Sequence, residues 1–163
     1  LSMKELVLLR HAKSSWELNV ADRHRPLTEK GMQRIQKMAL AKPEVFSDAE
    51  IIYTSPANRA CHTASIMVHS LDLPFEKVVL TEELYTFEAS KLLYFIQTIS
   101  DTYQRVVCVG HNPAFTQAVE YLSGSQFDHL PTAAWAKLKF IQNNWKDVSN
   151  GTLLLGMPKK IVQ

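Results

Sequence analysis

Two histidines stand at the ends of apolar runs, where their side chains could act on a phosphoryl group. His11 follows the run 6–9 and Arg10, and His111 follows the run 106–110. An arginine offers a phosphate dianion fixed positive charge and N–H donors in a planar fork that stays protonated near neutrality. A neutral imidazole can attack phosphorus through one ring nitrogen if the other donates its proton, usually to a carbonyl oxygen. The pair Arg10-His11 therefore indicates phosphoryl transfer, with His11 as nucleophile and His111 as a donor to a phosphate oxygen.

A third polar segment brings another arginine to the same kind of position. Residues 50–54 predict a strand, and Ser55 with Pro56 predicts a helix that begins with a cap residue and a proline at its first position. Arg59 would then lie in the first turn of this helix, where free N–H groups and the helix dipole favour an anion. The Asn-Pro pair at 112–113 repeats the same helix-start pattern.

The elements that must position these side chains alternate between strand and helix signals. Short aliphatic and β-branched runs predict strands, and apolar residues three or four positions apart predict helices. The expected strands are 6–10, 50–54, 78–80, 106–109, 135–141 and 152–157, and the expected helices are 28–42, 56–71, 89–100 and 113–123. This order favours a three-layer α/β fold, with helices on both faces of a mostly parallel central sheet and an antiparallel addition near the C-terminus. Such folds bind ligands beyond the carboxyl ends of their strands, where all three polar segments begin.

Composition and charge are those of an ordinary globular domain. The chain has 163 residues, of which 46% are hydrophobic and 21% charged, so we expect one domain over 1–163 and exclude disordered and fibrous classes. A net charge of +2 without a long basic run gives no support for binding nucleic acid. No apolar stretch approaches the roughly 20 residues that span a bilayer, so no membrane association is expected. Cys61 and Cys108 lack metal-binding spacing and are expected to be reduced and packed, which agrees with a cytoplasmic protein.

Several motifs, in their order along the chain, resemble the histidine phosphatase superfamily. They are residues 9–14 (LRHAKS), residues 54–56 (TSP) with Arg59, residues 110–113 (GHNP), and residues 25–31 (RPLTEKG) and 83–85 (ELY), the last two being similar to the SixA-like phosphohistidine phosphatases. The resemblance implies a phosphoglycerate mutase-like fold with minimal insertions and a reaction in which His11 is transiently phosphorylated. It also implies a phosphate pocket formed by Arg10, Arg59 and His111. The family often has glycine where this chain has Ala12, at a position that must let the phosphate come close.

The residue that protonates the leaving group is a further expectation from this resemblance. In the wider superfamily it is an acidic residue, often a glutamate in the middle of the chain, and the candidates here are Glu82 and Glu83. We favour Glu83 because it borders the Leu-Tyr pair at 84–85, although both glutamates could equally be solvated loop residues. An imidazole leaving group has a pKa of about 6.5, so a phosphohistidine substrate needs little acid assistance, unlike an alkyl ester.

Further polar residues are candidates for contacts with the substrate. Ser14 and Asn112 could donate to phosphate oxygens, although Asn112 could instead cap its helix and the serine could only form a turn. Arg25, with Lys13 and Arg23 nearby, could attract an anionic substrate or could simply be solvated. The sequence has no HExxH, GxxxxGK[ST] or GxGxxG pattern, so neither a metal nor a nucleotide cofactor is expected. All three tryptophans are expected to be packing residues.

Three functional hypotheses follow. The first is a metal-independent phosphatase that acts on phosphohistidine in a phosphorylated protein, because the short segment between Glu83 and the strand 106–109 leaves no long insertion to cover the site. The second is a phosphatase of a small phosphorylated metabolite, with Glu83 as an essential acid. The third is a non-catalytic module that binds phosphorylated proteins, which the presence of both histidines and both arginines argues against.

Overall fold

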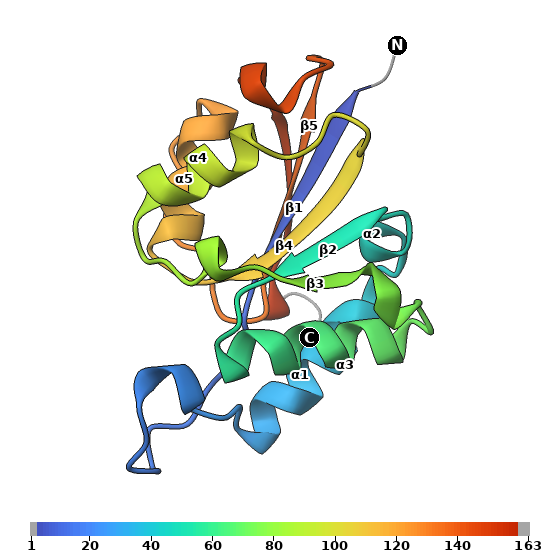
Figure 1. Cartoon of the computed structure of the whole chain (residues 1–163). Helices are drawn as coiled ribbons and strands as arrows, with labels where there is room; N and C mark the ends of the chain where they lie inside the picture. Colours follow the sequence, from blue (N-terminus) through green and yellow to red (C-terminus); the bar gives the residue numbers. More distant parts are fainter. Residues whose placement is uncertain (1–2, 160–163) are drawn as a thin grey trace.

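The computed structural model describes residues 3–159, which form one six-stranded sheet with helices on both faces (Figure 1). The strand order is β3-β2-β4-β1-β5-β6. The strands are β1 (Lys4–Arg10), β2 (Ile51–Thr54), β3 (Val78–Leu80), β4 (Arg105–Gly110), β5 (Trp135–Phe140) and β6 (Thr152–Gly156). Strands β1 to β4 are parallel, whereas β5 is antiparallel to both β1 and β6. The prediction of a three-layer, mostly parallel α/β fold with antiparallel strands near the C-terminus is confirmed.

Two layers of helices enclose this sheet. One face is covered by α1 (Glu29–Ala41), α2 (Glu44–Ser47) and α3 (Asn58–Ser70), and the other by α4 (Ala89–Gln97) and α5 (Ala114–Ser123) (Figure 1). Short 3₁₀ helices lie in the connections at η1 (Asp22–His24), η2 (Phe75–Lys77), η3 (Glu82–Leu84) and η4 (Trp145–Asp147). Within residues 3–159, no helix has the length and apolar character that crossing a membrane requires.

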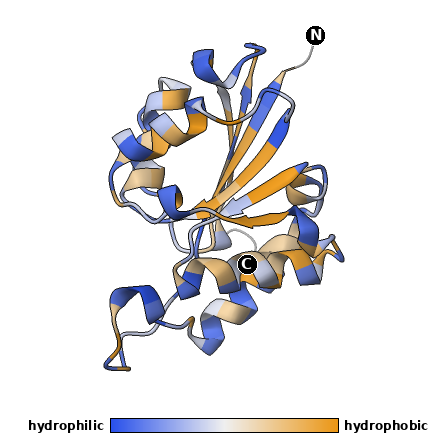
Figure 2. Cartoon of the chain, viewed as in Figure 1, coloured by the Kyte–Doolittle hydropathy of each residue, from blue (hydrophilic) through white to orange (hydrophobic). Residues whose placement is uncertain are grey.

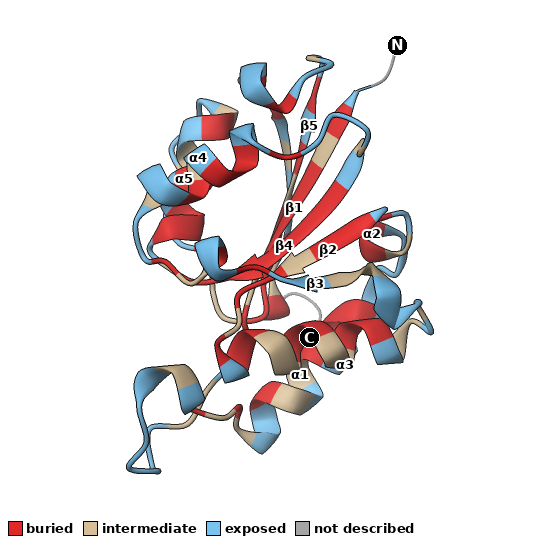
Figure 3. Cartoon of the chain, in the orientation of Figure 1, coloured by how far each residue is buried: buried red, intermediate tan, exposed pale blue. Residues whose placement is uncertain are grey.

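Strand β1 is buried on both sides between β4 and β5 (Figure 3). Leu6 and Leu8 pack into the core beneath α4 and α5, whereas Val7 and Leu9 pack into the core beneath α1 and α3. This division arises because successive side chains of a strand point to opposite faces of the sheet. Parallel strands covered on both faces need apolar residues at nearly every position, and the apolar central strands in Figure 2 meet this requirement.

The start of α3 differs from the expectation. The helix begins two residues after Pro56, with Ala57 at its cap position, so Ser55 does not cap it. The Ser55 hydroxyl instead accepts a hydrogen bond from the backbone N–H of Ala57 at 3.2 Å and contacts Nε2 of His111 at 2.8 Å. A contact with a residue far along the chain therefore overrides the local capping pattern.

The start of α5 is one residue later than expected, at Ala114. Asn112 still satisfies a free N–H of the first turn, because its Oδ1 accepts a hydrogen bond from the backbone N–H of Thr116 at 3.0 Å. At the other end of this helix, Gly124 adopts a φ of 70°, a left-handed conformation that glycine accommodates without strain. The predicted end of the helix at Gly124 is confirmed.

The long loop between β1 and α1 is fixed at its base by backbone contacts. Ser14 and Leu27 form an isolated antiparallel bridge, and the backbone N–H of Thr28 donates to the carbonyl of Lys13 at 2.9 Å. A Cβ atom at Gly31 would overlap the backbone of Lys13, so glycine allows α1 to pack directly against the start of the loop. The loop thus leaves the sheet in a defined direction.

The tryptophans do not all pack as expected. Trp135 and Trp145 are buried in the core, but the side chain of Trp16 is 77% exposed. Its indole ring lies over the guanidinium of Arg25, with the Cζ atom 3.4 Å from the ring centroid. The prediction of a packing role for Trp16 is wrong, because its loop projects beyond the ends of the strands and away from either core (Figure 1).

Candidate active site

The carboxyl ends of β1 and β4 bring the two predicted histidines together. Arg10 and Gly110 are partners at the end of the β1–β4 ladder, so His11 and His111 leave the sheet side by side. Their ring centroids are 5.3 Å apart. A pocket of about 410 Å³ opens here, lined by Arg10, His11, Lys13, Ser14, Trp16, Asp22, Arg25, Arg59, Phe87, His111, Asn112 and Thr132.

The His11 side chain has the arrangement that a nucleophilic imidazole requires. It is buried, and Nδ1 lies 2.7 Å from the carbonyl oxygen of Ala12. A carbonyl can only accept a hydrogen bond, so Nδ1 carries the proton and Nε2 retains its lone pair. Burial lowers the pKa of His11 to about 4, and the positive charges of Arg59 and Arg10 add to this effect against the opposing hydrogen bond to Ala12. The ring is therefore neutral at physiological pH.

His111 is also buried and neutral. Its Nε2 contacts the Ser55 hydroxyl at 2.8 Å, while its Nδ1 has no hydrogen-bond partner. Burial lowers its pKa to about 3, helped by the neighbouring His11 and Arg59. An incoming phosphate dianion would favour the charged form of this ring, because an anion within a few ångströms raises the pKa of an imidazole.

We expect both rings to stay neutral well below the usual imidazole pKa. Between about pH 4 and 6.5 the unfolded chain binds more protons than the folded one, so the free energy of unfolding should fall as the pH falls through this window. Titration of the imidazole rings by NMR measures their pKa values, and urea unfolding at several pH values measures the change in the free energy of unfolding. His11→Asn should weaken the pH dependence of stability, and a His11 midpoint at pH 6 or above would contradict the prediction.

Arg59 is almost fully buried, with 2% of its side chain exposed. Its Nη1 donates to the backbone carbonyl of Asp22 at 2.8 Å, and its Nη2 donates to the Asp22 carboxylate at 3.0 Å. The Nε atoms of Arg59 and Arg10 are buried without a hydrogen-bond partner. Arg10 is held by its Nη1, which donates to the carbonyl of Leu130 at 3.0 Å. Two guanidiniums with unpaired donors therefore border the His11 ring.

Arg25 is a third guanidinium in this pocket and comes from the β1–α1 loop. Its Nη1 donates to the hydroxyl of Ser14 at 2.9 Å and to the carbonyl of Ser15 at 3.3 Å. Its Nε donates to Asp22 at 3.3 Å, and the Trp16 indole covers one face. These contacts fix the plane of a buried cation, so the loop supplies charge to the pocket.

Asp22 is a site residue that the sequence analysis missed. It accepts hydrogen bonds from Arg59, from Arg25 and, at 2.6 Å, from the Tyr85 hydroxyl. Partial burial raises the pKa of the Asp22 carboxyl, but the hydrogen bonds from Tyr85 and Arg59 outweigh it and lower this pKa to about 2. The signal available in the sequence was its place directly before Arg23 and close to the Arg-Pro pair at 25–26.

The structure does not bring Glu83 into the pocket. Glu83 is exposed on η3 and lines a different hollow, with Ser90, Lys91 and Tyr94. Its neighbour Glu82 is also exposed and is paired with Arg23, with a shortest N–O distance of 2.6 Å. The expectation that Glu83 lies beside the reacting atoms is therefore wrong, because the short η3 helix turns Leu84 into the core and Tyr85 towards Asp22 instead.

The remaining predicted contact residues all line the pocket. Ser14 lies beside Arg25, whereas both ends of the Asn112 amide are already engaged, with Nδ2 donating to the carbonyl of Leu130 at 2.9 Å and Oδ1 accepting from Thr116. Asn112 thus has a structural role at this position. Over residues 3–159, no cluster of three or more His, Cys, Asp or Glu side chains is arranged to hold a metal ion.

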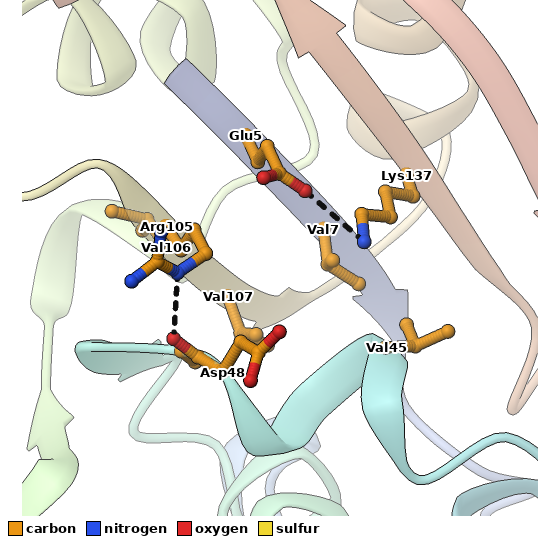
Figure 4. A pocket seen from close by; sticks show the side chains of 9 residues that line it. Glu5, Val7, Val45, Asp48, Arg105, Val106, Val107 and Lys137 are labelled. Carbon is orange, nitrogen blue, oxygen red and sulfur yellow. Dashed lines mark hydrogen bonds and ion pairs between the residues drawn. The ribbon is translucent and has the colours of Figure 1, made fainter. Parts of the chain in front are cut away.

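A small hollow at the amino ends of β1 and β4 is a separate feature (Figure 4). Its volume is about 10 Å³, which is room for one water molecule. Glu5 forms an ion pair with Lys137 at 3.1 Å, and Nε of Arg105 donates to the carbonyl of Asp48 at 3.1 Å. Its size excludes a substrate.

The family model described as histidine phosphatase superfamily (branch 1) matches residues 6–88. The chain belongs to the histidine phosphatase superfamily. The match contains His11 and Arg59, and the structure adds His111 to the same pocket from β4. Among curated proteins, an uncharacterized chloroplastic protein of Arabidopsis thaliana is 29% identical over 153 residues, which cover 88% of this chain and 70% of that protein.

Solved structures of histidine phosphatases have the same fold. A candidate phosphohistidine phosphatase SixA from Agrobacterium tumefaciens is 25% identical, with a TM-score of 0.74 over 84% of this chain and 92% of that chain. The protein histidine phosphatase SixA complexed with tungstate is 21% identical, with a TM-score of 0.82 over 96% of this chain and 99% of that chain. The phosphoglycerate mutase-like architecture is confirmed, and the family and its SixA neighbours support a phosphatase activity.

Proposed function

We propose that this protein is a metal-independent phosphatase that removes phosphate from phosphohistidine in another protein, through a phosphohistidine intermediate on His11. The observation that carries this proposal is the combination of a neutral nucleophile with an ionised carboxylate. Among the described residues that line the pocket, Asp22 is the one carboxylate, and its lowered pKa leaves it no proton to donate near neutrality. Such a site favours substrates whose leaving group does not need an acid.

The first step is the attack of His11 Nε2 on phosphorus. The new P–N bond to His11 forms while the P–N bond of the substrate breaks, and the substrate imidazole, protonated from solvent on its other ring nitrogen, leaves as a neutral ring. The proton of His11 stays on Nδ1 and remains hydrogen-bonded to the Ala12 carbonyl oxygen, which stabilises the positive charge that the phosphorylated ring carries. In the second step, water attacks the phosphorus, inorganic phosphate departs, and His11 is regenerated.

The arginines bind and stabilise the phosphoryl group. We assign this role to Arg10, Arg59 and Arg25, whose guanidiniums are each fixed by contacts with the protein and need no reorganisation when charge develops. His111 donates to a phosphate oxygen, and the Ser14 hydroxyl can do the same beside Arg25. Four cations and one carboxylate line the pocket, so the local charge suits a dianion.

The nature of the leaving group separates phosphohistidine from an ordinary ester. An alkoxide is a strong base, and general acid catalysis typically contributes about 10²–10⁴-fold to reactions that release such groups. A protonated phosphohistidine releases a ring whose pKa is about 6.5, so it loses little when no acid is present. The names of the SixA neighbours agree with a phosphohistidine substrate. A cytoplasmic location fits the two free cysteines, Cys61 and Cys108.

We expect the purified protein to prefer a phosphohistidine peptide over a phosphoserine peptide of matched sequence by at least about 100-fold in kcat/KM, because of the missing acid. Glu83→Gln should change kcat/KM for each of the two peptides by less than about twofold, since Glu83 lies outside the pocket. Glu82→Gln is the matched control, and parallel assays with small phosphometabolites test the second hypothesis. Equal loss on both peptides in Glu83→Gln, or a preference for the ester, would overturn the phosphohistidine proposal.

A further inference from the structure

Two exposed aromatic side chains line the same pocket as His11. Trp16 comes from the β1–α1 loop, and Phe87 comes from the segment after η3. Trp16 is 77% exposed and Phe87 is 48% exposed. Large aromatic groups left in water beside a polar pocket are available to contact a ligand.

The position of Trp16 is fixed without being buried. One face of its indole lies on Arg25, and Arg25 is held in plane by Ser14, Ser15 and Asp22. A ring on a fixed guanidinium loses little conformational freedom when a ligand arrives. The exposed fraction of Trp16 leaves the rest of the indole open beside a residue that we assign to phosphate binding.

Phe87 belongs to a chain of rings that ends at the reacting group. Its centroid is 5.5 Å from the ring of His111 and 6.1 Å from the ring of Tyr85, and His111 is 5.3 Å from His11. Tyr85 is anchored by its hydrogen bond to Asp22. Phe87 therefore borders the phosphate pocket from the η3 side, while Trp16 borders it from the loop side.

We propose that Trp16 and Phe87 form a subsite that contacts the planar imidazole of the leaving group, so that the enzyme distinguishes a phosphorylated ring from other P–N compounds. This inference rests on the proposed phosphohistidine activity. The phosphoryl group contacts the arginines, and the ring attached to it packs against the aromatic faces at the rim. Aromatic pairs with centroids 4.5–7 Å apart attract each other beyond the effect of buried area alone. A substrate with a planar aromatic leaving group should therefore bind more tightly than one that releases ammonia.

The test compares two substrates that share a P–N bond, a phosphohistidine peptide and inorganic phosphoramidate, which has no ring. We expect Trp16→Ala and Phe87→Ala each to raise KM for the peptide by about 5- to 20-fold. Turnover of phosphoramidate should change by less than about twofold, because Ser14, Ser15 and Asp22 still hold Arg25 by hydrogen bonds in both variants. Tyr121→Ala, which removes a 70% exposed tyrosine of α5 that does not line the pocket, is the matched control.

The possible outcomes separate this inference from the function on which it rests. If Trp16→Ala lowers turnover of both substrates equally, Trp16 only supports Arg25, and the subsite is overturned. If neither variant changes KM for the peptide while the wild-type protein hydrolyses it, the phosphatase proposal stands and the subsite is again overturned. If the wild-type protein hydrolyses phosphoramidate and not the peptide, the proposed function fails together with the subsite. Restoration of the peptide KM by Trp16→Phe would support stacking.

Discussion

Replacement of His11 by asparagine is expected to lower turnover of phosphohistidine by on the order of 10⁴- to 10⁶-fold, the usual effect of removing a covalent nucleophile. Asparagine can still donate to the Ala12 carbonyl, but it has no lone pair that can attack phosphorus. His111 cannot take over, because Ser55 occupies its Nε2 and the donation to a phosphate oxygen that we assign to its Nδ1 requires a proton there, which leaves this nitrogen no lone pair. The fold should be retained, since the substitution removes a burial cost together with the ring.

A covalent intermediate gives this prediction a second measurement. After mixing with ³²P-labelled phosphohistidine peptide and rapid denaturation in mild base, the wild-type protein should carry label that acid removes, as a P–N bond requires. His11→Asn should carry none. His24→Asn is the matched control, because His24 is an exposed residue of η1 outside the lining of the pocket. Undiminished label in His11→Asn, or no label in the wild-type protein under single-turnover conditions, would contradict the assigned nucleophile.

The scaffold of the site was predictable because its signals are local. The apolar runs of β1 and β4 are long enough to identify buried strands. Once the strands are identified, the residue that follows each of them must lie at the carboxyl end of the sheet. The parallel pairing of these strands then places His11 beside His111. Arg59 follows β2 by a similar argument, although the helix that carries it begins later than the Ser-Pro pattern indicates.

The contacts around the loop were not predictable in the same way. The segment between β1 and α1 has no hydrophobic period, so nothing in the sequence says which of its side chains turns towards the pocket. Asp22 meets Arg59, 37 positions away, and Tyr85, 63 positions away. Such pairs depend on the direction in which the loop leaves the sheet, which the contact of Gly31 with Lys13 sets.

The misplacement of Glu83 has a similar cause. The motif around residues 83–85 does lie next to the site, but η3 is a single tight turn in which neighbouring side chains point in different directions. Leu84 faces the core, Tyr85 faces Asp22, and the two glutamates face solvent. Proximity in sequence to a site residue therefore did not give proximity to the reacting atoms.

Arg59→Ala is expected to lower kcat/KM for the phosphohistidine peptide by about 10²- to 10³-fold, the usual effect of removing one fixed donor to a developing charge. Arg59→Lys should recover little of this loss, because an ammonium cannot reproduce the planar fork that contacts Asp22 through two nitrogens. The inhibition constant of inorganic phosphate should rise in both variants. Arg105→Ala, at the amino end of β4, removes a cation from the opposite edge of the sheet and serves as the control.

The pairing of Arg59 with Asp22 allows two effects of Arg59 to be measured separately, namely its charge next to the phosphate and its restraint of the β1–α1 loop. Arg59→Ala leaves the Asp22 carboxylate without its strongest cationic partner, so part of the loss could come from a displaced loop. Asp22→Asn keeps a carbonyl oxygen for Tyr85 and Arg59 but removes the negative charge, and it should cost far less activity than Arg59→Ala. The double variant should regain thermal stability relative to Arg59→Ala without regaining turnover, because the loop no longer holds a carboxylate that has lost its Arg59 partner, while the phosphate still lacks its guanidinium. Recovery of turnover in the double variant would instead show that Arg59 acts by restraining the loop, and the phosphate-binding role would pass to Arg10 and Arg25.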